Sequence, residues 1–192
     1  MIRRLYDWTL SLAAGPRAPA ALGSVSFVES SVFPIPPDIL LIPMVIARRE
    51  KAWWYALLCT VASVAGGVLG YLIGMFLFEQ VAVPILSFYG KMEKFDEFRD
   101  VFNHWGWWFV FIAGLTPFPY KVITIASGVA GLSLPVFVVA SIVSRGLRFF
   151  VVAGLLYLFG PVIKDFIEKR LGLMFTLFVV LLVGGFILLR YI

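Results

Sequence analysis

The sequence predicts an all-α integral membrane protein, built as an inverted repeat of two re-entrant helical hairpins. Each hairpin is followed by a transmembrane helix, and a further transmembrane helix lies at the C-terminus. Of the 192 residues, 61% are apolar and only 14% are charged, whereas soluble domains are about 45–50% apolar and about 25% charged. Several apolar stretches are long enough to span a bilayer. Two more of similar length are interrupted at their centres by prolines, and these two repeat each other.

The composition also excludes several functional classes. The single cysteine, Cys59, allows no internal disulfide and no cysteine-based zinc site, and the single histidine, His104, has no second ligand nearby. Nucleotide-binding and hydrolase motifs are missing, as is a nucleophile–base pair, so we expect no enzyme, no metal and no cofactor. The net charge of +5 comes from basic residues at segment ends, where they orient a membrane protein, so nucleic acid is not an expected partner.

The chain begins with a segment, residues 1–16, that predicts a short amphipathic helix on the membrane surface. A cleaved signal peptide is the weaker alternative, because the apolar stretch is short and contains Asp7. Basic residues are more numerous on the face that holds the N-terminus. This distribution predicts a multi-pass protein of the inner (plasma) membrane with a cytoplasmic N-terminus.

Uninterrupted spanning helices need about 20 mostly apolar residues. Residues 53–78, residues 135–159 and the C-terminal stretch within 161–192 meet this requirement. Residues 85–104 combine many charges with apolar side chains at helical spacing, which predicts a helix lying in the membrane interface.

The interrupted stretches span about residues 18–47 and 105–134. Their centres contain the sequences PIPPD, from Pro34, and TPFPYK, from Thr116. Proline removes a backbone donor and clashes with the preceding turn, so each pair of prolines should end a helix. We therefore expect two half-helices meeting at a turn, a re-entrant hairpin, with one kinked spanning helix as the alternative.

The two interrupted stretches match each other in register. Pro34 and Pro36 correspond to Pro117 and Pro119, and Asp38 corresponds to Lys121. A hairpin returns to its own side and the helix after it crosses once, so the second hairpin must enter from the opposite face. Such inverted repeats with broken segments are typical of secondary transporters, whose sites lie where the breaks meet.

A stripe of small residues runs along one face of the first spanning helix, with Gly66, Gly70 and Gly74 at every fourth position. Small residues let helices approach closely. We expect this stripe to pack against a hairpin of the same chain, and the alternative of a homo-oligomer contact stays open.

Five ionisable residues fall within the apolar stretches and are candidates for function, because charge at membrane depth is costly. They are Glu29, Asp38, Lys121, Arg145 and Arg148. A carboxylate away from water holds a proton more readily, which makes Glu29 and Asp38 candidates for proton coupling. The alternative is a closed salt-bridge network, but three cations face two carboxylates, and this surplus favours an anionic ligand.

The basic side chains are the candidates for binding that ligand. Lys121 lies where a half-helix begins, a place where backbone donors favour anions, and Thr116 and Thr124 add hydroxyl groups. Arg145 and Arg148 are three residues apart, hence on one helix face, and guanidinium groups suit phosphate oxygens.

The residues around both breaks resemble a known family. FVESSVFPIPPD, ending at Asp38, looks like the first motif of the DedA family, also called VTT or SNARE-associated membrane proteins. GLTPFPYK, ending at Lys121, is similar to the second motif, most closely in the YqaA branch. The resemblance covers about residues 23–160. It implies two facing re-entrant hairpins and the movement of phospholipids or undecaprenyl phosphate between leaflets, coupled to protons in some members.

Matched residue by residue, the family's acidic pair would be Glu29 and Asp38, and its basic position would be Lys121. Many members have a further arginine where this chain has Leu115-Thr116. We therefore expect a flippase for a lipid with an anionic head group. The alternatives are a proton-coupled exporter of a small soluble solute and a membrane scaffold that transports nothing.

Overall fold

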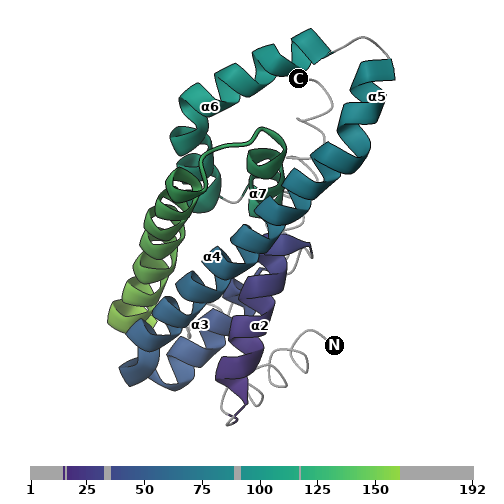
Figure 1. Ribbon diagram of the computed structural model, residues 1–192. Helices are drawn as coiled ribbons and strands as arrows, with labels where there is room; N and C mark the ends of the chain where they lie inside the picture. The colour runs from purple at the N-terminus through teal and green to yellow at the C-terminus, as the bar shows by residue number, and fades with distance from the viewer. Residues whose placement is uncertain (1–14, 16, 33–35, 89–91, 117, 161–192) are drawn as a thin grey trace, which may run out of the picture.

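A computed structural model of the protein describes residues 15, 17–32, 36–88, 92–116 and 118–160. Throughout this part of the chain the regular elements are helices (Figure 1), so the predicted all-α class is confirmed. Apart from Gly15, the predicted N-terminal segment lies outside the described residues, and so does the predicted C-terminal transmembrane helix.

The first interrupted stretch forms two helices, α2 (Ala18–Ser31) and α3 (Asp38–Ala47). Helix α2 ends where Val32 leaves the helical conformation, with φ −139°. Pro37 precedes α3 and Asp38 is its first residue, as expected for a proline that starts a helix and a carboxylate near the positive end of the helix dipole. The predicted break is confirmed. At 10 residues, α3 is about 15 Å long, or half a bilayer.

The second interrupted stretch repeats this order with α6 (Met92–Leu115) and α7 (Tyr120–Val129). Pro119 has an extended backbone, with ψ 100°, directly before α7. Helix α7 has the same length as α3, 10 residues.

The structure contradicts the predicted boundary of the interfacial helix at residue 104. Residues 92–104 and 105–115 form one continuous helix, α6, and residues 85–88 belong to a separate helix, α5 (Val83–Phe88). No proline interrupts α6, and Gly106 alone costs a helix only about 1 kcal/mol. A Cβ atom at Gly106 would overlap the end of the Leu132 side chain, which would have to shift.

Among the described residues, two helices are long and apolar enough to cross a membrane. They are Arg49–Gln80 and Leu134–Gly160. The first comprises a short 3₁₀ turn, η1 (Arg49–Lys51), then α4 (Ala52–Leu77), and it continues into a π-helical turn, η2 (Phe78–Ala82). Both agree with the predicted spans, although the first passes its predicted end at residue 78.

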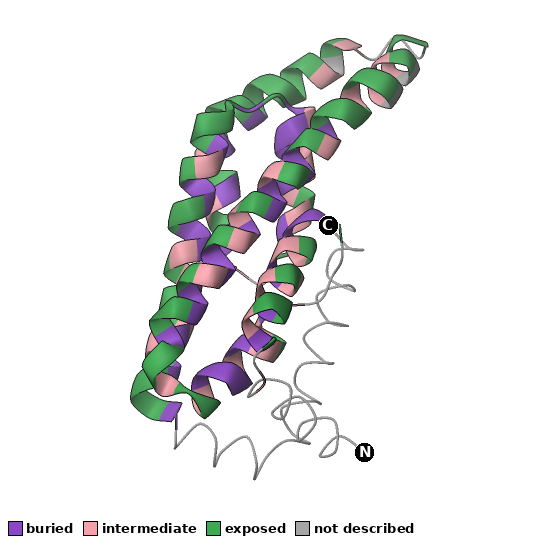
Figure 2. Ribbon diagram, turned by 60° about the horizontal axis from the view of Figure 1, so that its bottom comes forward, coloured by how far each residue is buried: buried purple, intermediate pink, exposed green. Residues whose placement is uncertain are grey.

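Exposed residues, green in Figure 2, run along the outer faces of these two helices, and many of them are large and apolar. Val61 is 60% exposed, Phe76 63% and Leu158 66%. Soluble monomers rarely expose apolar surface on this scale, so the faces suit a lipid environment.

The two long helices lie side by side and run in opposite directions (Figure 1). Gly160 lies beside Arg49 and Gly146 beside Thr60, and at the other end the Phe137 ring centroid lies 5.4 Å from that of Tyr71. Since each helix follows the second half of a broken stretch, equivalent elements of the two repeats are antiparallel.

Glycines of α4 allow both broken stretches to pack directly against it. A Cβ atom at Gly66 would overlap the Phe27 carbonyl oxygen of α2, and one at Gly74 would overlap the Ile125 carbonyl oxygen of α7. The small-residue stripe is therefore used within the chain, as expected, and α4 joins the first repeat to the second.

Candidate functional site

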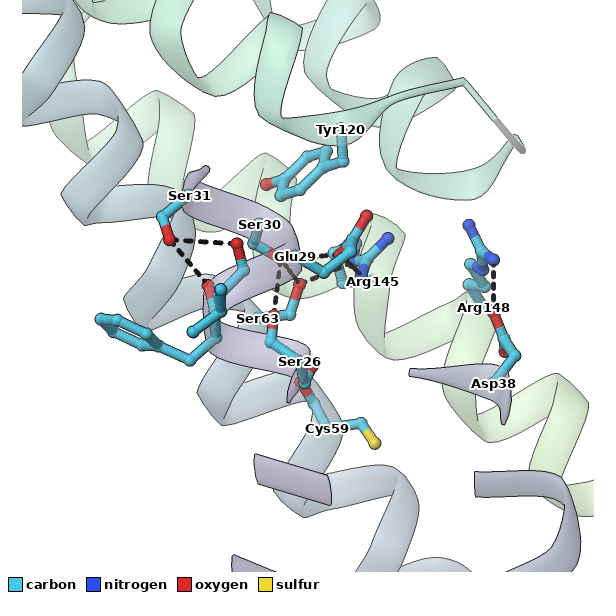
Figure 3. A network of polar contacts seen from close by, with 12 residues as sticks. Ser26, Glu29, Ser30, Ser31, Asp38, Cys59, Ser63, Tyr120, Arg145 and Arg148 are labelled. Carbon is cyan, nitrogen blue, oxygen red and sulfur yellow. Dashed lines mark hydrogen bonds and ion pairs between the residues drawn. The ribbon is translucent and has the colours of Figure 1, made fainter. Parts of the chain in front are cut away.

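A buried ion pair joins the first broken stretch to the helix Leu134–Gly160. The Arg145 Nη2 atom lies 2.8 Å from the Glu29 Oε2 atom, and the two side chains are 1% and 15% exposed. Glu29 is near the end of α2, and its partner is 116 residues away in the sequence. The pair lies close to the first break (Figure 3).

Serines complete a ring of hydrogen bonds around this pair. Arg145 Nε donates to Ser63 Oγ at 2.6 Å, and Ser63 Oγ lies 2.7 Å from Ser30 Oγ, which donates to Glu29 Oε2 at 3.1 Å. Ser26 lies one turn before Ser30 on α2, and its hydroxyl donates to the Cys59 carbonyl oxygen of α4. Charged groups that leave water need such partners. None of these three serines was among the predicted site residues, although the four-residue spacing of Ser26 and Ser30 on an apolar helix is the signal for a polar stripe.

Aromatic rings hold the Arg145 guanidinium from two sides. Its central carbon lies 4.9 Å from the Tyr120 ring centroid and 4.7 Å from that of Phe149. A cation over an aromatic face is stabilised most strongly where water is excluded. Tyr120 was not among the predicted site residues.

A second ion pair joins the two breaks to each other. Arg148 Nη2 donates to Asp38 Oδ2 at 2.7 Å, and Arg148 Nη1 donates to the Thr116 carbonyl oxygen at 3.2 Å. Asp38 starts α3 and Thr116 follows the end of α6, so one guanidinium group contacts both breaks. Both side chains of this pair are 21% exposed.

Lys121 and Thr124 also reach across from the second repeat to the first. Lys121 Nζ donates to the Val32 carbonyl oxygen, where α2 ends, at 3.3 Å. A cation suits that place, because the C-terminal end of a helix carries partial negative charge. Thr124 Oγ1 is buried and lies 3.2 Å from the Ser30 carbonyl oxygen. The predicted meeting of the two breaks is thus present in the contacts of Lys121, Thr124 and Arg148.

The sequence had left open whether a carboxylate of the facing hairpin or a ligand balances Lys121. Within the described residues, Glu29 and Asp38 each pair with an arginine, and no ion pair involves Lys121. The surplus positive charge is therefore on Lys121, which is only partly buried.

Thr116, a predicted binding residue, uses its hydroxyl at the end of α6: it donates to the Ile112 carbonyl oxygen at 2.8 Å. Among the described residues no cluster of three or more metal-ligating side chains occurs.

Comparisons with known proteins identify the family of this chain. The family model for the VTT domain matches residues 35–158, which include the end of the first break, the whole second break and most of the helix that carries the two arginines. The chain belongs to the VTT-domain (DedA) family. Members of this family are membrane-associated proteins, and the family is linked to membrane transport.

Relatives in the VTT-domain family cover most of the chain. An uncharacterized protein of Haemophilus influenzae is 38% identical over 151 residues, which are 79% of this chain and 78% of that protein. A second uncharacterized protein, from Histophilus somni, is 34% identical over the same shares of both chains. No solved structure matches. Glu29 precedes the matched VTT domain, whereas Asp38, Lys121, Arg145 and Arg148 lie within it.

Proposed function

We propose that this VTT-domain protein moves a phosphate-bearing lipid, a phospholipid or undecaprenyl phosphate, between the leaflets of a membrane. The proposal rests on the position and the contacts of Lys121. Its ammonium group lies at the meeting point of the two breaks and contacts a backbone carbonyl oxygen of the first break. No carboxylate of the described residues forms an ion pair with it. A phosphate oxygen is the stronger partner for this group.

In this proposal the head group meets Lys121 and Arg148 first. Arg148 is 21% exposed, whereas Arg145 is 1% exposed and is closed off by its partners. Arg145 contacts the phosphate only after the Glu29 pair opens. Protonation of Glu29 or Asp38 removes the charge that holds an arginine, and this step is where transport couples to a proton gradient. No covalent step is involved.

The proposal includes a membrane arrangement. The two broken stretches are re-entrant hairpins that enter from opposite faces of the inner membrane, and the N-terminus is cytoplasmic. The antiparallel order of the two long helices supports this inverted topology. The short α3 and α7, each 10 residues, support half-membrane depth.

The test is transbilayer movement of two labelled lipids, a phospholipid and undecaprenyl phosphate, in proteoliposomes of known protein content. Lys121→Ala should slow movement of the favoured lipid by at least about tenfold, the loss expected for a charge-assisted contact of about 1.5–3 kcal/mol. Lys51→Ala is the matched control, because Lys51 is exposed in η1, away from both breaks. Its rate should equal that of the wild type.

Other outcomes point to other functions. If wild-type protein moves neither lipid but takes up a soluble solute, the exporter is favoured. If neither lipid nor solute moves and Lys121→Ala causes no cellular defect, the scaffold is favoured. Coupling is tested separately with an imposed pH gradient, and equal stimulation of wild type, Glu29→Gln and Asp38→Asn would reject the proton step.

A further inference from the structure

Tyr120 directly follows the second break, and its ring lies against the Arg145 guanidinium of the Glu29–Arg145 pair. Both rings beside the Arg145 guanidinium are buried, but they come from different places. Phe149 is one turn further along the same helix, so it moves together with Arg145. Tyr120 is the first residue of α7. The Tyr120 ring, which lies over the pair in Figure 3, can therefore shift relative to the guanidinium when α7 moves.

The Tyr120 ring is held firmly in this position. Its hydroxyl donates to Ser141 Oγ at 2.5 Å, and Ser141 Oγ donates to the Phe137 carbonyl oxygen at 2.6 Å. The ring also lies beside Gly67, where a Cβ atom would be 3.4 Å from Tyr120 Cε1. A ring held by these contacts restricts where the guanidinium can lie.

The first two residues of α7 therefore contact two different parts of the site. Lys121 reaches from the start of α7 to the Val32 carbonyl oxygen at the first break, while Tyr120 is fully buried against Arg145. Because one helix turn carries both side chains, a bound head group that shifts the start of α7 through Lys121 also shifts the ring over Arg145.

We propose that Tyr120 is a positioning residue: it holds the Arg145 guanidinium against Glu29 and transmits displacement at Lys121 to this ion pair. The transmission rests on the proposed transport function, whereas the positioning of the pair does not. The two parts are therefore tested by separate measurements on the full chain.

Positioning is tested by thermal unfolding in detergent, in two backgrounds. In otherwise wild-type protein, Tyr120→Leu should lower Tm by roughly 4–8 °C, as expected for a desolvated cation–π contact in a chain of this size. In a Glu29→Gln/Arg145→Met background, which has no ion pair to position, the same substitution should lower Tm by less than half as much. Tyr120→Phe keeps the ring. With phenylalanine at this position, the Tm difference between the otherwise wild-type protein and the Glu29→Gln/Arg145→Met background should therefore stay close to its value with tyrosine.

Equal losses in both backgrounds would show that the ring only fills space and would overturn the proposal. Should the Leu variant not fold, Tyr120→Met is measured in the same two backgrounds. The matched control is Tyr157→Leu, which removes a ring 5.5 Å from the Arg49 guanidinium carbon, and its loss should not depend on the background.

Transmission is tested by lipid movement in the same proteoliposomes. Tyr120→Leu should slow it by at least about tenfold, since misplaced groups commonly cost that much or more. Tyr120→Phe should restore the rate and Tyr157→Leu should leave it unchanged. Unchanged transport in Tyr120→Leu would overturn transmission. Absence of lipid movement in wild-type protein would instead overturn the transport function, and the unfolding measurements would still decide whether Tyr120 positions the pair.

Discussion

The buried ion pair gives a prediction whose magnitude follows from its burial. Glu29→Gln leaves the Arg145 guanidinium charged, 1% exposed and without its carboxylate. Removing one partner of a buried pair costs about 3–5 kcal/mol. For a chain of 150–250 residues each kcal/mol lowers Tm by about 2–4 °C, so Tm should fall by about 6–20 °C.

The second ion pair provides the comparison. Asp38 and Arg148 are each 21% exposed, so the arginine that Asp38→Asn leaves behind is less deeply buried than Arg145, and it keeps the Thr116 carbonyl oxygen as a partner. The cost of Asp38→Asn should be about 1 kcal/mol, or about 2–4 °C in Tm. The order of the two losses is therefore set by burial, although the two N–O distances, 2.8 and 2.7 Å, are nearly equal.

The assay is thermal unfolding of detergent-solubilised protein at neutral pH, followed by tryptophan fluorescence. A double variant, Glu29→Gln/Arg145→Met, removes the unpaired charge and should recover at least about half of the loss, because apolar replacements of buried pairs are often neutral. The reasoning is refuted if Glu29→Gln loses no more than Asp38→Asn, or if the double variant is less stable than Glu29→Gln alone.

Two further predictions concern glycines, each measured as a change in Tm. Gly66→Ala should cost about 1–3 kcal/mol, because its Cβ atom would overlap the Phe27 carbonyl oxygen. Its control is Gly146→Ala, whose Cβ atom meets only the Thr60 Cγ2 atom at 3.7 Å. This substitution should be neutral or stabilising by up to about 1 kcal/mol. Equal changes in Tm for the two variants would contradict the packing of α2 on α4. Gly131→Ala should cost about 1–2 kcal/mol, because this residue has φ +66°. A loss no larger than that of Gly146→Ala would argue against a left-handed turn after α7.

The positions of the breaks could be predicted because they depend on neighbouring residues. Pro37 directly precedes α3 and Pro119 directly precedes α7, as the geometry of proline requires. The predicted end of the interfacial helix at residue 104 was wrong because it rested on composition alone. The charged residues stop there and an apolar stretch begins, but no residue breaks the helix, so α6 continues to Leu115.

The candidate site could be predicted in its members but not in its pairing. Arg145 and Arg148 were expected to act together on one helix face, yet they pair with different carboxylates. Tyr120 carries no signal of function by residue type, because aromatic side chains are common in apolar helices, and Ser30 is marked only by its four-residue spacing from Ser26. Their importance comes from the guanidinium group that folding brings beside them.

The sequence by itself determined the apolar helices, the two proline breaks, their repetition and the set of charged residues placed among them. Each of these follows from hydropathy or backbone geometry over a segment of about 10–20 residues. Only the tertiary structure decided that Arg145 pairs with Glu29, 116 residues away, and Arg148 with Asp38, 110 residues away. It also decided that Lys121 contacts a carbonyl oxygen instead of a carboxylate. The contacts of Glu29 and Lys121 depend on how closely α2 and α7 approach α4, and that approach is allowed by Gly66 and Gly74 of α4, which are far from these charges in sequence.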